Sequence, residues 1–409
     1  MADFIEIVVN GEDMPFFFKP ASHAAQAPKL AKSTCLLNLM RVTVAILIVV
    51  LFAANAHADG DPILIGQSAV LTGPFTPNSL AFISGQTLFF NKFNAVGGLN
   101  GHPIKVITYD DAYLGDRAAA NTERLIKQDH VICLFGTMGT AIGAAMTKVA
   151  MEHHSFIFGG LTGAEILRDT KLPVYHIRAS YADEARRTMT HLRIIGQTRV
   201  AVISSDDAYG KGIEEVTLRA LSDGGNPAVI SLRFDPKQDN LRDIAERVTK
   251  SNAQAVYVIA AGLPAINVIR ALSVLPSHPP IYTNSVGSSF LLYKELGDKS
   301  RGIVLSQVMP PFWQTRLRIT KEYQQALQSA GQQNQASYMS LEGYITAKVF
   351  TEMLRRVPGS VTTESLRHAI ENSGPVDVGD FNLSFSPSKK SGSDFVDITF
   401  LSGGGKFVQ

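Results

Sequence analysis

The sequence predicts an α/β protein made of doubly wound parallel sheets, and three observations lead to that prediction. From Asp59 onward, short apolar runs bounded by turn residues alternate with segments of helical periodicity, which is the order expected of βαβ units. The apolar runs are nearly continuous rather than alternating, as in strands covered by helices on both faces. The series occurs twice, over 60–178 and 179–308, and a chain of 409 residues has room for two or three domains. We therefore expect two doubly wound units.

The expected elements follow the chain in a regular order. Strands are predicted at 63–70, 104–110, 131–135, 155–158 and 174–178 in the first series, and at 199–205, 228–234, 255–260, 280–284 and 302–308 in the second. Helices are predicted between them at 79–95, 117–129, 140–152, 183–195, 210–223, 239–251 and 264–275. A helical region at 337–356 and late strands near 381–385 and 394–400 follow. Gly97 and Gly98 stand where the first helix needs a left-handed C-cap.

The N-terminus has the features of a secretory signal peptide. The apolar run 42–54 follows Arg41 and is shorter than the roughly 20 residues that a membrane-spanning helix needs. A small-residue A-x-A site ends at Ala58, so we expect cleavage there. Met40 directly precedes Arg41, so we expect translation to begin at Met40 and residues 1–39 to be an extension. An uncleaved membrane anchor is the alternative.

Charge and cysteine content narrow the functional classes. The net charge is +2, so nothing in the composition calls for nucleic acid or an anionic membrane surface as a partner. Cys35 precedes the cleavage site and only Cys133 would survive processing, which leaves no internal disulfide and no cysteine zinc site. Export without disulfides fits a bacterial periplasm.

Several segments, taken in order, resemble one known family. They are "IGQSAVLTGPF", "FNAVGGLNGHPIKVITYDDA", "LTGAEILR", "IRASYADE", "DDAYGKG" and "SLEGYITAKV". Over nearly all of 60–402 the chain is similar to the type I periplasmic binding proteins, in the branched-chain amino acid and amide branch of ABC-transporter solute-binding proteins. The resemblance implies two Rossmann-like lobes joined by three crossovers, with a ligand cleft between them. It implies a first lobe of 59–178 plus 309–380 and a second lobe of 179–308 plus 381–409, after the extension and signal peptide at 1–58.

Candidate ligand contacts of the first lobe follow its strands, because ligands of open α/β sheets bind outside the carboxyl ends of the strands. The segment "GTMGTAIG" (136–143) follows one strand and opens a helix, whose N-terminal N–H groups favour a carboxylate. Gly139 lets a ligand approach the backbone, and by resemblance Thr140 matches the Ser/Thr that holds the ligand carboxylate. Thr72, in the loop 72–74, is expected on the same side. The alternatives are an ordinary βα turn with Thr140 as N-cap and a dinucleotide site, although the spacing is not G-x-G-x-x-G.

The stretch "GGLTGAEILRD" (159–169) raises a similar choice. Thr162 and Glu165 have the spacing of a helix capping box. By resemblance, Thr162 also matches a second ligand-contacting threonine, and Gly160 matches a position whose backbone meets the ligand amine. The alternative is a helix cap and nothing more.

The second lobe offers aromatic and polar candidates. By resemblance, Tyr209 matches a tyrosine that covers the ligand when the cleft closes, and Tyr181 in the first crossover is a further candidate for the cleft. Asp206 and Asp207 are either near the ligand or caps of the following helix.

One departure from the family bears on the ligand. Amino-acid binders of this family carry an acid after a second-lobe strand, and Ser285 stands near the matching place here. A common aromatic after 255–260 is replaced by Ala261-Gly262. Because a buried ammonium without a countercharge is costly, either Asp206, Asp207 or Glu342 replaces the acid, or the ligand is a small carboxylate, an amide or an aromatic acid.

No motif of an enzyme is present: the chain lacks G-x-S-x-G, H-E-x-x-H and a Walker A sequence. His153-His154 has no acidic partner at ligand spacing, and no cofactor is expected. We expect a monomeric, exported binding protein that closes by hinge bending on a small molecule and delivers it to a membrane permease of an ABC importer. A ligand-sensing receptor subunit of the amide-regulator type is the alternative.

Overall fold

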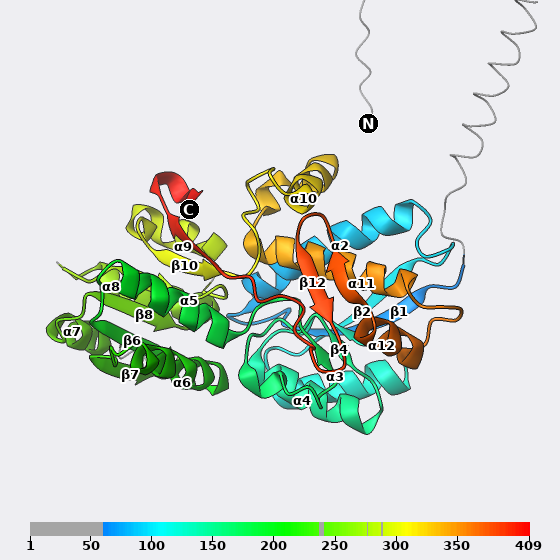
Figure 1. The fold of residues 1–409 in the computed structure, drawn as a ribbon, viewed down its shortest axis with the longest axis horizontal. Coiled ribbons are helices and arrows are strands. Elements are labelled where there is room, and N and C mark those ends of the chain that lie inside the picture. Colours follow the sequence, from blue (N-terminus) through cyan, green and yellow to red (C-terminus); the bar gives the residue numbers. More distant parts are fainter. Residues whose placement is uncertain (1–59, 237–240, 276, 288) are drawn as a thin grey trace, which may run out of the picture. The chain divides into compact units, whose positions relative to one another are not determined.

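A computed structural model describes residues 60–409, apart from 237–240, 276 and 288. The first lobe is built on a parallel five-stranded sheet in the order β2-β1-β3-β4-β5. Its strands are β1 (Ile63–Ala69), β2 (Ile104–Asp110), β3 (Leu134–Phe135), β4 (Ile157–Phe158) and β5 (Val174–Tyr175). Consecutive strands joined by helices give the doubly wound unit that the sequence predicts (Figure 1).

The second lobe is built on a seven-stranded sheet in the order β14-β13-β10-β9-β8-β6-β7. Its strands are β6 (Val200–Ser205), β7 (Ile230–Phe234), β8 (Ala255–Ile259), β9 (Ile281–Thr283), β10 (Val304–Gln307), β13 (Asp397–Leu401) and β14 (Phe407–Val408). The first five are parallel, and β13 and β14 add to the edge in antiparallel orientation. The predicted α/β class with two parallel-sheet units is therefore confirmed.

The helices lie close to their predicted positions. They are α2 (Thr76–Ala95), α3 (Gly115–Lys127), α4 (Thr140–Glu152), α5 (Tyr181–Ile194), α6 (Ala208–Asp223), α7 (Leu241–Lys250), α8 (Gly262–Ser273) and α11 (Tyr338–Arg355). The sequence analysis missed α9 (Ser289–Leu296), α10 (Arg318–Ser329), α12 (Thr363–Glu371) and strand β11 (Gly374–Asp377), which pairs with β12 (Asn382–Phe385). Apart from α9, which lies between the predicted strands at 280–284 and 302–308, these elements follow the alternating series that guided the prediction.

The chain passes between the two sheets three times, after β5, after β10 and between β12 and β13. The first and third passages meet at a parallel bridge between His176 and Ser391. The hairpin of β11 and β12 places the ring of Phe385 6.2 Å from that of Phe158, beside the five-stranded sheet. The residue boundaries of the lobes given above stay a prediction.

Two glycines allow α2 and α11 to pack closely. A Cβ on Gly85 would lie 1.7 Å from the carbonyl oxygen of Ser340, and one on Gly343 would lie 2.0 Å from that of Phe82. Neither position can hold a larger residue unless the helices move apart. The glycine of the "LEGY" segment is therefore a packing requirement of the first lobe.

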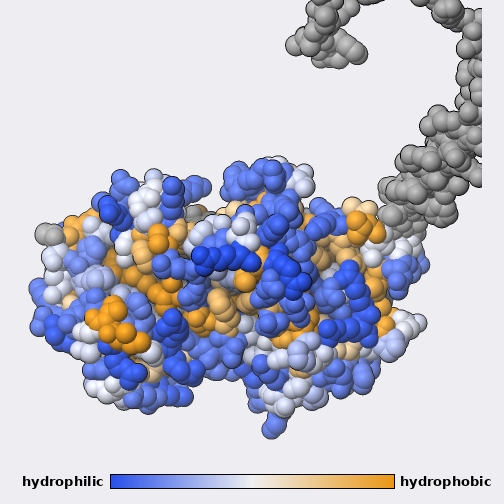
Figure 2. Space-filling model, turned by 45° about the horizontal axis from the view of Figure 1, so that its top comes forward, coloured by the Kyte–Doolittle hydropathy of each residue, from blue (hydrophilic) through white to orange (hydrophobic). Residues whose placement is uncertain are grey.

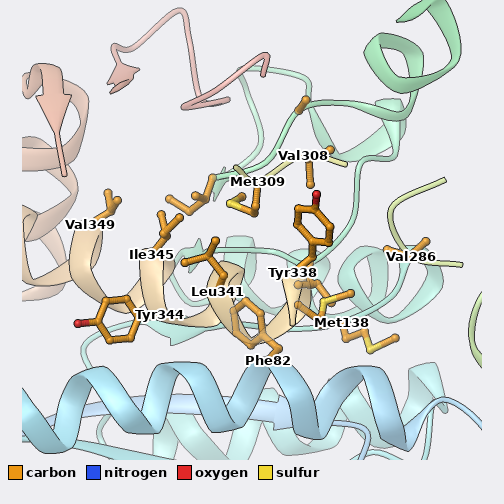
Figure 3. Close-up of a cluster of buried hydrophobic side chains, with 14 of the residues drawn as sticks. Phe82, Met138, Val286, Val308, Met309, Tyr338, Leu341, Tyr344, Ile345 and Val349 are labelled. Atoms are coloured by element: carbon orange, nitrogen blue, oxygen red, sulfur yellow. The ribbon is translucent and has the colours of Figure 1, made fainter. Parts of the chain in front are cut away.

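Buried side chains from both lobes form a continuous apolar cluster beside these helices. Figure 3 shows Phe82 of α2 and Leu341 of α11 converging with Met309 from the second passage and Val286 from the loop after β9. The side-chain amide of Asn78 also donates to the Val286 carbonyl (3.1 Å). The lobes are in direct, buried contact here.

Cys133 is fully buried, and burial raises the pKa of its thiol well above the usual range, which fits the expected core role. None of the described helices is long and apolar enough to cross a membrane. The apolar run 42–54, the cleavage site at Ala58 and Cys35 lie outside the described residues.

Candidate functional site

The turn between β3 and α4 brings its backbone against an aromatic ring. Gly139 is the N-cap of α4 with φ +103°, and a Cβ there would lie 2.6 Å from the Tyr113 ring. A side chain is excluded both by the backbone conformation and by this close approach. Thr140 is the first residue of α4 and makes no capping bond with its side chain, so the N-cap alternative for Thr140 is wrong.

The hydroxyls of two buried threonines meet at the start of α4. The Oγ1 atoms of Thr140 and Thr162 lie 3.1 Å apart, and both residues are almost fully buried. Thr162 Oγ1 also accepts a hydrogen bond from the backbone N–H of Ala164 (3.2 Å). The backbone N–H of Tyr181, the first residue of α5, donates to the carbonyl of the neighbouring Gly163 (2.8 Å). Three separate segments therefore converge at Thr162 and Gly163.

The capping box predicted at Thr162 and Glu165 is wrong. Residues Glu165–Leu167 form only one turn of 3-10 helix, whose N-cap is Ala164 and has no side-chain cap. Glu165 instead accepts a weak hydrogen bond from the backbone N–H of Ala182 (3.3 Å). The local pattern was misleading because both side chains bond to groups brought in by the tertiary fold.

The carbonyl of Gly160 points at a buried histidine. Nδ1 of His176 lies 3.3 Å from the Gly160 oxygen, and Nε2 lies 3.0 Å from the Leu167 oxygen. Burial lowers the pKa of His176 to about 3, so the ring is neutral near pH 7 and has a single N–H to donate. One of the two carbonyls is thus left without that donor.

Tyr181 and Tyr209 pack against each other across the lobe junction. Their ring centroids are 5.5 Å apart in an edge-to-face arrangement, and both side chains are buried. The Tyr209 hydroxyl lies 3.0 Å from Oδ1 and 2.8 Å from Nδ2 of Asn284, in the loop after β9. Burial raises the pKa of both phenols, so they are neutral groups at pH 7.

Ser285 belongs to a buried ionic network. Its backbone N–H and its hydroxyl both donate to the carboxylate of Glu184 on α5 (2.9 and 2.8 Å), and Ser306 donates to the same carboxylate (2.6 Å). Arg178 donates to Ser285 Oγ and lies 3.6 Å from Glu184. The sequence analysis missed Arg178 and Glu184, although both lie within the quoted segment "IRASYADE".

A second carboxylate reaches this network from α11. Oε1 of Glu342 lies 3.7 Å from Nε of Arg178, and both side chains are 5% exposed or less. Burial raises the pKa of Glu342. Among the described residues, Nε and Nη1 of Arg178 have no hydrogen-bond acceptor. With Glu184 already held by three hydrogen bonds, Glu342 is the less satisfied acid of the pair.

Asp206 and Asp207, the other two acids considered as partners of a ligand ammonium, differ from Glu342 in their surroundings. Asp207 is the N-cap of α6 and accepts from the Gly210 N–H (2.7 Å). Asp206 is half exposed and pairs with Lys211 (2.8 Å). Asp207 thus caps α6, and Asp206 pairs with a lysine of α6.

Thr72 is not part of the hydrogen-bonded cluster. It is exposed, and its hydroxyl donates to Asp110 (2.7 Å). Its neighbour Phe75 instead reaches the second lobe, because a Cβ on Gly262 would lie 3.0 Å from the Phe75 ring. A first-lobe phenylalanine thus lies against Gly262, in the segment where the resemblance leads us to expect an aromatic residue.

A small cavity of about 120 Å³ opens beside Thr140 between the lobes. Its walls come from 164–166 on the first-lobe side and from α6 on the other, and include Ala208, Gly212, Glu215, Val216 and Arg219. Ligand pockets for small molecules are commonly about 300–1,000 Å³. This cavity is therefore smaller than a typical pocket for a small solute.

Among the described residues, no group of three or more His, Cys, Asp or Glu side chains is arranged to hold a metal ion. His153 is the C-cap of α4. The candidate site is built from hydroxyls, aromatic rings and one buried ionic network.

Comparisons with known proteins identify several similar chains. A family model described as "Periplasmic binding protein" matches residues 62–394. An amino acid binding protein of Pseudomonas aeruginosa is 24% identical over 207 residues, which is 50% of this chain and 54% of that relative. This chain thus spans about half the length of that curated relative.

Two solved structures resemble almost the whole described chain. A possible leucine/isoleucine/valine-binding protein from Rhodopirellula baltica has a TM-score of 0.81 and 24% identity, covering 86% of this chain and 97% of that one. A substrate-binding periplasmic protein from Ralstonia solanacearum has a TM-score of 0.78 and 27% identity, covering 85% and 99%.

Proposed function

The chain belongs to the periplasmic binding protein family, whose members bind substrates rather than transform them, and we propose that it captures a small amino-acid-like solute for an ABC importer. The protein acts in the periplasm after cleavage at Ala58, as a monomer, and hands its ligand to a membrane permease. Relatives named as amino acid and Leu/Ile/Val-binding proteins support the solute class.

The observation that carries this proposal is the pair of buried hydroxyls at the N-terminus of α4. Thr140 and Thr162 meet at 3.1 Å, beside the helix end whose free N–H groups attract an anion. No charged side chain is needed there, because hydroxyls and backbone N–H groups donate several hydrogen bonds to one carboxylate. We assign the ligand carboxylate to this position, with Gly139 and Gly160 as backbone contacts.

Glu342 is the proposed partner of a ligand ammonium. Its carboxylate is buried, accepts no hydrogen bond from any described side chain and has a raised pKa. An ammonium beside it would provide the opposite charge that an ionised buried carboxylate requires. Ser285 acts indirectly, because its hydroxyl bonds both Glu184 and Arg178. Glu184 therefore stays paired with Arg178 and does not contact the ligand.

Lobe closure explains the remaining site residues. Tyr181 and Tyr209 meet across the junction, and the cavity beside Thr140 is too small to admit a solute directly. The lobes therefore open for entry and close with the tyrosine pair over the ligand, by hinge bending of the three passages between the sheets. Thr72 borders the open cleft.

A thermal-shift comparison of three matched ligands tests this assignment. Leucine has both charged groups, leucinamide lacks the carboxylate and 4-methylpentanoate lacks the amine. A ligand at 100 times its Kd adds about 2.7 kcal/mol to the free energy of unfolding. We expect leucine, or another amino acid of a wider panel, to stabilise the protein more than both of its analogues. Stabilisation by 4-methylpentanoate alone would refute the role of Glu342. If no compound of the panel raised the melting temperature, the proposal of solute binding would be refuted.

A further inference from the structure

A second cavity lies at the hinge side of the molecule and shares no lining residue with the cavity at Thr140. Its volume is about 800 Å³, within the range of pockets that hold organic ligands. One wall is α2, through Pro77, Leu80, Ala81 and Ser84, and another is the segment 334–337 before α11. The opposite wall is second-lobe structure, Tyr293 and Lys294 of α9 and 405–407 near the C-terminus. Figure 2 shows hydrophobic surface exposed along this junction of the two halves.

The floor of this cavity is aromatic. Trp313 stacks on Phe407 with centroids 5.4 Å apart and an interplanar angle of 14°. Phe312 packs edge-to-face against both rings, at 5.2 and 5.8 Å. All three rings are partly exposed and line the cavity. Such a surface favours the packing of an apolar or aromatic group.

The charged residues of the lining are all of one sign. Lys294 and Lys406 are exposed at the cavity, and no Asp or Glu lines it. Neither ammonium forms an ion pair with any residue that the structure describes. Ser84, Gln335 and Ser337 add uncharged polar groups to the walls. The lining is thus complementary to a molecule with an apolar body and an anionic end.

We propose that this cavity is an accessory binding site for an amphiphilic carboxylate, whose apolar body lies on Trp313 and Phe407 and whose carboxylate pairs with Lys294 and Lys406. The occupant contacts both lobes, because the walls come from both. A bound molecule would therefore influence opening and closing of the cleft. This site is separate from the solute site proposed above and does not depend on it.

Trp313 is the only tryptophan of the chain, so its emission reports directly on this cavity. The probe is octanoate, with octanamide as the neutral analogue of the same length. We expect a saturable blue shift of Trp313 emission with octanoate, as the chain of the probe excludes water from the ring. Octanamide should bind at least tenfold more weakly.

Charge-deletion variants place the probe at the lysines. Lys294→Gln combined with Lys406→Gln should weaken octanoate at least tenfold. Lys148→Gln combined with Lys250→Gln, two exposed lysines of α4 and α7 outside the cavity, should leave the affinity unchanged. The proposal is overturned by an absent or non-saturable shift, by equal affinities for octanoate and octanamide, or by equal effects of the two double variants.

Discussion

Nε of Arg178 lies 3.7 Å from Oε1 of Glu342, and both side chains are buried where the first passage between the lobes meets α11. Arg178 also contacts Glu184 and Ser285, so a single guanidinium joins α5, α11 and the loop after β9. This network is the electrostatic centre of the lobe junction, and four predictions follow from it and its surroundings.

Arg178→Met should lower the free energy of unfolding by about 3–5 kcal/mol, because two buried carboxylates lose their common cation. Urea denaturation at pH 7 measures the loss. Arg186→Met is the matched control, since its pair with Asp183 is exposed and should be worth less than about 1 kcal/mol. Equal losses in the two variants would show that the buried network is energetically unimportant.

Glu342→Gln should flatten the dependence of stability on pH. Burial raises the pKa of Glu342 in the folded protein, so the folded state binds a proton more tightly than the unfolded chain. The stability that this group contributes is therefore present below the unfolded pKa of about 4.3 and is lost as pH rises through the folded pKa. Melting temperatures of wild type and variant between pH 4 and 8 test this.

The control for that series is Glu352→Gln, at the more exposed end of the same helix. It should follow the wild-type curve. Parallel curves for the wild type and Glu342→Gln would contradict the raised pKa.

Thr162→Ala should weaken binding of the stabilising amino acid by about 1.5–3 kcal/mol, the usual value of a hydrogen bond to a charged group. The change removes the hydroxyl that meets Thr140. Titration calorimetry gives the affinity, and Thr170→Ala at an exposed position is the control. An unchanged Kd would leave Thr162 as a structural residue only.

Gly343→Ala should destabilise the first lobe by about 1–3 kcal/mol, because the added methyl would lie 2.0 Å from the Phe82 carbonyl and force α2 and α11 apart. Gly212→Ala in α6 meets nothing within 4 Å and should stabilise its helix by up to about 1 kcal/mol. Thermal unfolding of both variants shows whether each substitution raises or lowers the stability of the protein. A neutral Gly343→Ala would mean that the helices separate without cost.

Local patterns predicted most elements to within a few residues. The strand at 104–110 and the helix at 140–152 have the bounds that the sequence predicts, because apolar runs and helical periodicity depend only on near neighbours. The strand predicted at 131–135 is reduced to β3, yet the Ile132 N–H still donates to the Leu64 carbonyl (2.9 Å). The elements after β10 were harder to predict, because α10 and α12 interrupt the alternation of strands and helices.

The sequence by itself determined the α/β class, the doubled series of strands and the position of Thr140 at a helix start. The segment "IRASYADE", quoted for the resemblance, contains Arg178 and Glu184 of the buried network, but nothing in the sequence marked them as partners. Only the tertiary structure decided that Thr162 bonds Thr140 rather than capping a helix, and that Glu342, rather than Asp206 or Asp207, faces Arg178. The physical reason is that burial and ion pairing depend on contacts between segments far apart in the chain, which local spacing does not encode.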